Sequence, residues 1–221
     1  MKSILFYSVI IILFSFSCRN SKEGKSTDTF TITIPDSLSE GVSDGRLVLM
    51  LSTNPEKEPR FEISDGPKTQ QAFGMNLENW KKGEKISFSV DAFGYPITSF
   101  SDFPAGEYYL QVLLHKYETF NLSTGKTVKL PMDRGEGQQW NLAPGNLYCT
   151  PQKVSIGKSG NIDIILDKKI PPIEPPKDTE WVKHIKMKSK LLSEFWGRSL
   201  LFILICFTHS VSLGETYQNE K

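Results

Sequence analysis

Short runs of apolar and β-branched residues, separated by prolines and glycines, extend over residues 30–166 and restrict the fold more than any other feature of the chain. Alternation of apolar and polar residues at a period of two is typical of half-buried strands, and few runs are long enough for a helix. We expect strands at residues 29–34, 46–52, 85–90, 107–120, 125–130, 152–156 and 161–166. The pattern therefore predicts a mostly β chain.

About seven strands within residues 30–169 of a 221-residue chain favour one main domain. Two packed antiparallel sheets with the dimensions of an immunoglobulin-like β-sandwich suit this number of strands. The 26 basic and 25 acidic residues nearly cancel, so the chain lacks the positive charge expected of a nucleic-acid-binding protein. We expect no nucleic acid among its partners.

The first 18 residues have the composition of a bacterial secretory signal peptide. Lys2 provides a short basic region, and an apolar core of about eleven residues follows, which is too short to span a bilayer comfortably. Ser17 precedes Cys18 as a small residue precedes the cysteine of a lipoprotein signal, although Ser15 stands where a leucine is usual. We expect Cys18 to carry lipid and to attach the exported protein to a membrane at the periplasmic or outer-membrane surface, with residues 19–29 as a flexible tether. Ordinary cleavage, the alternative, would give a secreted protein.

Cysteine and histidine give little sign of a metal centre. Cys149 and Cys206 remain when Cys18 is set aside, and neither has a histidine or second cysteine at the spacing of zinc ligands. We therefore expect no metal and no cofactor.

One motif resembles that of a serine hydrolase, because residues 41–45 read Gly-Val-Ser-Asp-Gly and fit G-x-S-x-G. A nucleophile elbow needs a strand before the serine and a helix after it, whereas a polar loop precedes Ser43 and a predicted strand follows. The histidines are His115, His184 and His209, and none has the context of a catalytic base. A chance match is favoured over an intact small hydrolase built on Ser43, and we expect no catalytic residue in this chain.

A second polar segment, residues 131–141, contains five side chains suited to binding: Asp133, Glu136, Gln138, Gln139 and Trp140. Carboxylates could bind calcium, and the amides with Trp140 could bind a sugar. The alternatives are an interface with another domain and, favoured most, an ordinary loop whose polar groups satisfy its own backbone. Likewise Trp80, Tyr95, Tyr148 and Trp181 could form an aromatic platform, although burial in the core explains them more simply.

The amino-acid composition of the chain changes twice after residue 169. Residues 170–180 are a proline-rich linker, and residues 181–198 have the pattern of the start of a second domain. Residues 199–221 begin with an abrupt apolar run unlike the segments around it. We hypothesise that this tail is a frameshifted reading.

Several short sequence segments within residues 30–198 resemble the N-terminal half of bacterial exported esterases. They lie at residues 46–52, 58–61, 69–74, 94–96, 104–109, 117–120, 130–133, 135–140, 144–148 and 190–198. In that family a β-rich region precedes an α/β-hydrolase domain, and the nucleophile, acid and histidine all follow the segment matching Trp196, Gly197 and Arg198. The resemblance implies a non-catalytic β-sandwich module whose partner is a hydrolase domain beyond residue 198. A free-standing surface module that binds glycans or peptides is the alternative.

Overall fold

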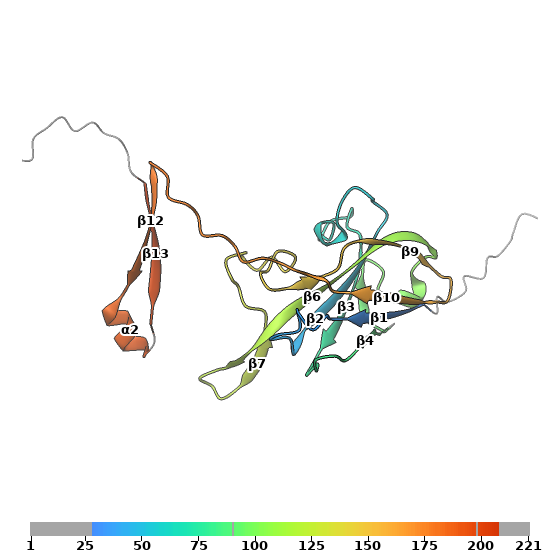
Figure 1. Cartoon of the computed structure of the whole chain (residues 1–221), viewed down its shortest axis with the longest axis horizontal. Coiled ribbons are helices and arrows are strands. Elements are labelled where there is room, and N and C mark those ends of the chain that lie inside the picture. The colour runs from blue at the N-terminus through green and yellow to red at the C-terminus, as the bar shows by residue number, and fades with distance from the viewer. Residues whose placement is uncertain (1–27, 90, 198, 208–221) are drawn as a thin grey trace, which may run out of the picture. The chain divides into compact units, whose positions relative to one another are not determined.

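The computed structural model describes residues 28–89, 91–197 and 199–207 (Figure 1). The predicted signal peptide with Cys18, most of the tether and residues 208–221 lie outside these ranges. The chain forms two compact units, Met1–Pro172 and Ile173–Lys221. None of the helices in the described part of the chain has the length and hydrophobicity that a membrane-spanning helix requires.

The larger sheet of the first unit has eight strands and is built around the long strand β6. Its main strand order is β11, β8, β6, β2, β3 and β5, and β7 and β9 also pair with β6. The bounds are β2 (Asp44–Ser52), β3 (Gln71–Leu77), β5 (Phe93–Tyr95), β6 (Gly106–Asn121), β7 (Thr127–Leu130), β8 (Leu147–Tyr148), β9 (Gln152–Ile156) and β11 (Lys168–Lys169). All the pairings in this sheet are antiparallel.

A smaller sheet packs on one face of the larger one. It has the order β10, β1, β4, with bounds β1 (Thr29–Thr33), β4 (Ile86–Phe88) and β10 (Asn161–Ile165). Strand β1 runs parallel to β10 and antiparallel to β4. The main core lies between the sheets and includes Phe30, Leu49, Phe73 and Val112. The second and third of these sit on β2 and β3, so the two sheets bury one continuous apolar layer.

Strand β2 is continuously apolar from Leu47 to Leu51 because both of its faces are covered there. Leu47 and Leu49 face the main core, whereas Met50 belongs to a second cluster on the opposite face. Leu113 and Ile170 complete the buried part of that cluster, against which Trp140 packs. Strands with two buried faces read as continuous apolar runs rather than alternating ones.

Two short 3₁₀ helices, η1 (Pro59–Phe61) and η2 (Phe100–Asp102), lie between strands of the first unit. Phe100 of η2 makes edge-to-face contacts with Phe30 and Phe73, at ring-centroid distances of 5.1 and 5.2 Å. Such aromatic pairs add stabilisation beyond their buried area. Helix η2 thereby joins the loop after β5 to the core.

The second unit is a hairpin interrupted by one helix. It comprises β12 (Val182–Lys188), α2 (Lys190–Trp196) and β13 (Leu201–Phe207), with β12 antiparallel to β13. Ser189 begins α2 by accepting a hydrogen bond from the Leu192 backbone N–H, and Gly197 ends it in the left-handed conformation. The apolar run at the start of the tail, which seemed unrelated to its surroundings, therefore contains β13, the partner strand of β12.

The prediction of a mostly β chain with antiparallel sheets packed as a sandwich is confirmed, except that β1 and β10 pair in parallel. The seven expected strands correspond to β1, β2, β4, β6, β7, β9 and β10. The immunoglobulin-like form stays a prediction. Strand β3, which lies between β2 and β5 in the larger sheet, was missed, as were the short strands β5, β8 and β11. Residues 190–196, which lie within the expected start of a second domain, form a helix.

Candidate functional site

The loop before β8 contains the predicted binding residues, and its carboxylates are occupied by the loop itself. Glu136 is buried and accepts a hydrogen bond from the Arg134 backbone N–H at 2.7 Å, and Asp133 accepts one from Gly135 at 2.8 Å. Arg134 also pairs with Glu118 of β6. The described residues contain no group of three His, Cys, Asp or Glu side chains able to hold a metal ion. The favoured expectation, that this loop satisfies its own polar groups, fits this geometry.

Trp140 is half-buried and packs on the cluster around Met50 and Leu113. Its backbone oxygen accepts a hydrogen bond from Asn146 at 2.8 Å, and Asn146 in turn accepts one from the Lys116 backbone N–H at 3.0 Å. The Trp140 side chain thus covers this part of the sheet and stays partly exposed. Gln138 and Gln139 are exposed beside it.

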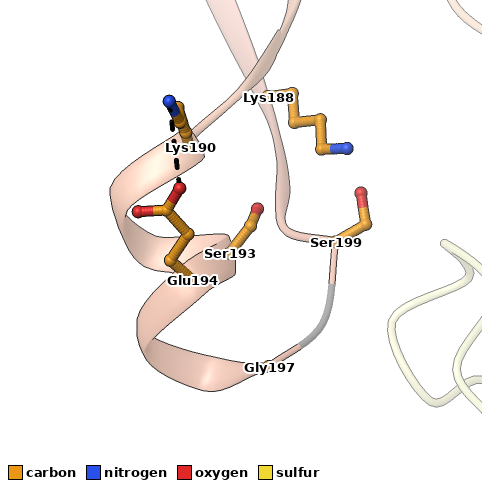
Figure 2. A pocket seen from close by; sticks show the side chains of 6 residues that line it. All are labelled: Lys188, Lys190, Ser193, Glu194, Gly197 and Ser199. Carbon is orange, nitrogen blue, oxygen red and sulfur yellow. Dashed lines mark ion pairs between the residues drawn. The ribbon is translucent and has the colours of Figure 1, made fainter.

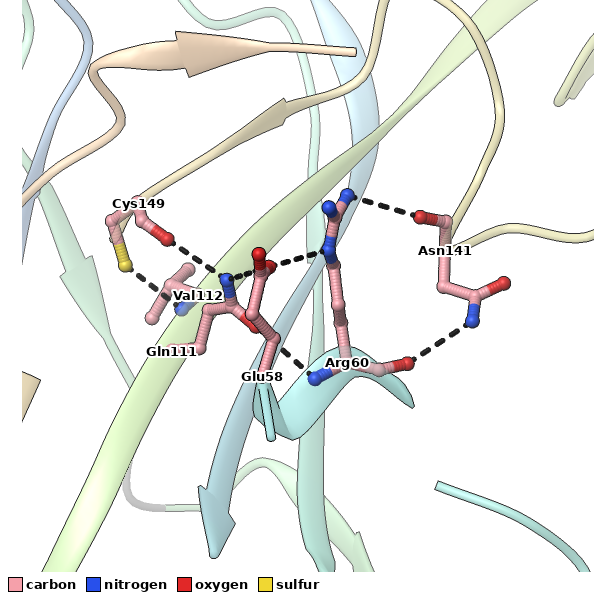
Figure 3. Close-up of polar contacts among 6 residues, drawn as sticks. All are labelled: Glu58, Arg60, Gln111, Val112, Asn141 and Cys149. Carbon is pink, nitrogen blue, oxygen red and sulfur yellow. Dashed lines mark hydrogen bonds and ion pairs between the residues drawn. The ribbon is translucent and has the colours of Figure 1, made fainter. Parts of the chain in front are cut away.

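A buried polar network holds this loop and η1 to β6 (Figure 3). The Gln111 side chain is fully buried, donates to Glu58 and to the Cys149 backbone oxygen, both at 3.0 Å, and accepts from the Arg60 backbone N–H at 3.1 Å. Arg60 pairs with Glu58 through Nε at 2.8 Å and exchanges two hydrogen bonds with Asn141. The described residues leave no buried side-chain N or O atom unpaired. The network therefore orders the loops around the sheet.

Three of the four aromatic residues considered for a platform have other roles or places. Trp80 is buried and donates from Nε1 to the Glu84 backbone oxygen at 2.9 Å. The Arg60 guanidinium lies over the Tyr148 ring, 4.2 Å from its centroid. Trp181 lies in the second unit. Of these four residues, Tyr95 is the one that is exposed on the sandwich, and Phe93, two residues before it on β5, is exposed as well.

Ser43 does not have the setting of a nucleophile. Its hydroxyl donates to Asp44 Oδ2 at 3.0 Å, and β2 begins at Asp44 where an elbow would require a helix. A 2.6 Å hydrogen bond from Lys129 is the main reason that the pKa of Asp44 lies below 3.8. Burial lowers the pKa of His115, although Glu136 opposes that shift, and its ring contacts the edge of Tyr117. His184 hydrogen-bonds Asp178 in the second unit, and His209 lies outside the described residues.

A hollow of about 560 Å³ lies beside α2 in the second unit (Figure 2). Lys188, Lys190, Ser193, Glu194, Gly197 and Ser199 line it. The Ser193 hydroxyl donates to the Ser189 backbone oxygen at 2.5 Å and accepts from the Leu200 backbone N–H at 3.0 Å. The first bond lies within the first turn of α2, and the second joins the helix to the residue just before β13, so this serine has a structural role.

No protein-family model, curated protein or solved structure matches the chain. Its function must therefore be inferred from its own residues and their geometry.

The Cys149 thiol is expected to be unreactive in the folded chain. It is buried, its sulfur accepts a hydrogen bond from the Val112 backbone N–H at 3.1 Å, and burial raises its pKa to about 11. A thiol reacts as the thiolate, so labelling at pH 8 should be about a hundredfold slower than for an ordinary cysteine. Mass spectrometry after timed iodoacetamide treatment, with and without urea, measures this. Rapid labelling of Cys149 without urea would contradict the burial.

Proposed function

We propose that this chain is a non-catalytic β-sandwich module of an exported, lipid-anchored esterase-like hydrolase, and that the unit β12–α2–β13 is its contact with a hydrolase domain. The observation that carries the proposal is the exposed apolar surface of this unit. Its large apolar side chains that are at least two-fifths exposed are Trp181, Ile185, Met187, Leu191, Leu192, Phe195, Trp196, Leu201, Phe202, Ile203, Leu204, Ile205 and Phe207. Continuous exposed apolar patches of this kind mark interaction surfaces.

The two-stranded sheet also supports a partner that contributes strands. Strands β12 and β13 pair only with each other among the described residues, so each has an edge with free backbone groups. An isolated hairpin is marginally stable at best in water. A domain with its own sheet could pair with one edge and bury the apolar faces, as an α/β-hydrolase domain would. Anchoring through Cys18 rests on the sequence alone.

The purified chain is expected to hydrolyse no short acyl ester. The Ser43 hydroxyl is engaged with Asp44, and no described histidine hydrogen-bonds it. Release of p-nitrophenol from its acetate and butyrate esters should match the rate without protein, and Ser43→Ala should change nothing. Hydrolysis that disappears in Ser43→Ala would make the chain an enzyme and overturn the non-catalytic assignment.

The DNA of the gene tests the proposed partner. Sequencing across codons 190 to 221 and beyond, with translation of every frame, should reveal a frame that encodes a hydrolase domain, either in a neighbouring gene or as a continuation of the segment ending at Trp196 and Gly197, in which hydrolase strands would take the place of β13 beside β12. That frame should encode a nucleophile elbow followed by an acid and a histidine. If neither this frame nor a neighbouring gene encodes such a domain, the proposed partner does not exist and the exposed hairpin needs another explanation.

A further inference from the structure

The outer face of the larger sheet, opposite the main core, is covered over only part of its width. Over β2 and β6, Met50 and Leu113 are fully buried beneath Trp140 and Ile170. Toward β5, the last strand in the main order, the cover ends. Here Phe93 is 66 % exposed and Tyr95 is 50 % exposed. Two large aromatic side chains are therefore exposed to solvent on a face whose other part is covered, and their exposure needs a physical explanation.

The positively charged side chain of Arg46 is fixed in position near these two rings. The guanidinium of Arg46 lies across Gly74, so close that a Cβ at position 74 would come 2.5 Å from Nη2 and 2.8 Å from Nε. Nη1 donates to the Asn76 side-chain oxygen at 2.8 Å. Within the described ranges no carboxylate forms an ion pair with Arg46. The remaining N–H donors of the Arg46 guanidinium are thus free to bind an anion.

The strand register brings the cation and the rings together. Arg46 is opposite Asn76, and Gly74 is opposite Phe93 on β5. Opposite residues of antiparallel strands project from the same face, and so do residues two apart on one strand. Neighbouring strands lie about 4.8 Å apart. The guanidinium over Gly74 is therefore one strand away from Phe93, on the face that also carries Tyr95.

We propose that Arg46, Asn76, Phe93 and Tyr95 form a binding surface for an acidic saccharide, one whose sugar rings carry carboxylates. Exposed aromatic rings stack on the C–H faces of sugars, and a guanidinium fork binds a carboxylate through two parallel hydrogen bonds. Charge complementarity selects an acidic over a neutral saccharide, because the cation has no carboxylate partner on the protein. An added peptide strand fits less well, because β5 offers only three residues of edge. This surface is independent of the proposed contact with a hydrolase.

The test uses the full chain and two probes, hexagalacturonate and its fully methyl-esterified form, in isothermal titration calorimetry. We expect hexagalacturonate to bind at least about tenfold more tightly than the ester, since esterification removes the charge-assisted hydrogen bonds. Arg46→Gln should abolish this preference, and Phe93→Ala should weaken both probes. Gly74→Ala should act like Arg46→Gln, because its Cβ would occupy the place of the guanidinium while both rings remain.

Arg134→Gln and Trp181→Ala are matched controls, since they remove an exposed cation and an exposed aromatic ring elsewhere and should bind as the unchanged protein does. Unfolding midpoints of all variants separate loss of fold from loss of binding. The inference is overturned if neither probe binds at about 1 mM, a weak affinity by any standard for a specific site. It is equally overturned if acid and ester bind alike, or if Phe93→Ala and Gly74→Ala leave binding of folded protein unchanged.

Discussion

Removing residues 173–221 is expected to keep the sandwich folded and to raise the concentration at which the protein stays monomeric by at least about tenfold. Burying one large apolar side chain in self-association contributes about 1.5 to 3 kcal/mol, and each 1.4 kcal/mol changes an association constant about tenfold. The removed unit exposes many such side chains, among them Phe195 and Phe207, both more than 70 % exposed. Analytical ultracentrifugation over a concentration series measures the gain.

The position of the cut follows from the structure. Ile170 belongs to the second apolar cluster and its backbone exchanges hydrogen bonds with Gly145 and Asn146, so the chain must extend past it. Pro172 ends the first unit. A cut after Pro172 therefore preserves every strand of the sandwich.

A full-length variant with Ile203→Lys and Ile205→Lys is the matched control for the truncation. Both residues lie on one face of β13, opposite Lys186 and His184, and charge on this exposed face should suppress self-association as the truncation does. Ser155→Lys, on β9 of the sandwich, should leave the association unchanged. A truncated chain that is less soluble or partly unfolded would show that the second unit stabilises the sandwich.

The strands that the sequence predicts are those whose residue types agree with their place in the fold. Strand β9 was predicted with its observed bounds, Gln152–Ile156, and β2 and β6 within a few residues. Strand β3 was missed because Gly74 and the polar residues Gln71 and Asn76 weaken the β pattern. The structure gives a reason for this glycine: Arg46 from the adjacent strand lies across it. A requirement set by a residue 28 positions away leaves no local signal.

The candidate site shows the same limit in its polar residues. The loop of Asp133 and Glu136 was recognised by composition, but composition does not tell that the loop's own backbone occupies both carboxylates. Arg46 and Phe93 were not recognised as parts of one site because they lie far apart in the chain, with β3 and β4 between their strands. Their nearness depends on the order β2, β3, β5. Side chains that meet across strands can be identified only when the strand order and the register are known.

Replacing Gln111 by leucine is expected to lower the free energy of unfolding by about 2 to 4 kcal/mol, because two buried backbone groups lose their partner. These are the Arg60 N–H and the Cys149 carbonyl, which Gln111 joins across a sequence separation of 38 to 51 residues. Glu58, whose side chain is 38 % exposed, can replace its lost bond with water and adds little. Urea unfolding followed by tryptophan fluorescence measures the change.

Gln139→Leu is the control, since it makes the same chemical change at an exposed position of the adjoining loop and should alter stability by less than about 0.5 kcal/mol. A double substitution of Gln111→Leu with Arg60→Leu distinguishes the network from simple packing. If the two side chains act through one network, the double variant should be less destabilised than the sum of the single variants, because both side chains donate to the same Glu58 carboxylate oxygen and losing either one weakens the hold of the other. Strict additivity would mean that the two side chains act independently, with Gln111 stabilising the fold through the Arg60 and Cys149 backbone groups alone.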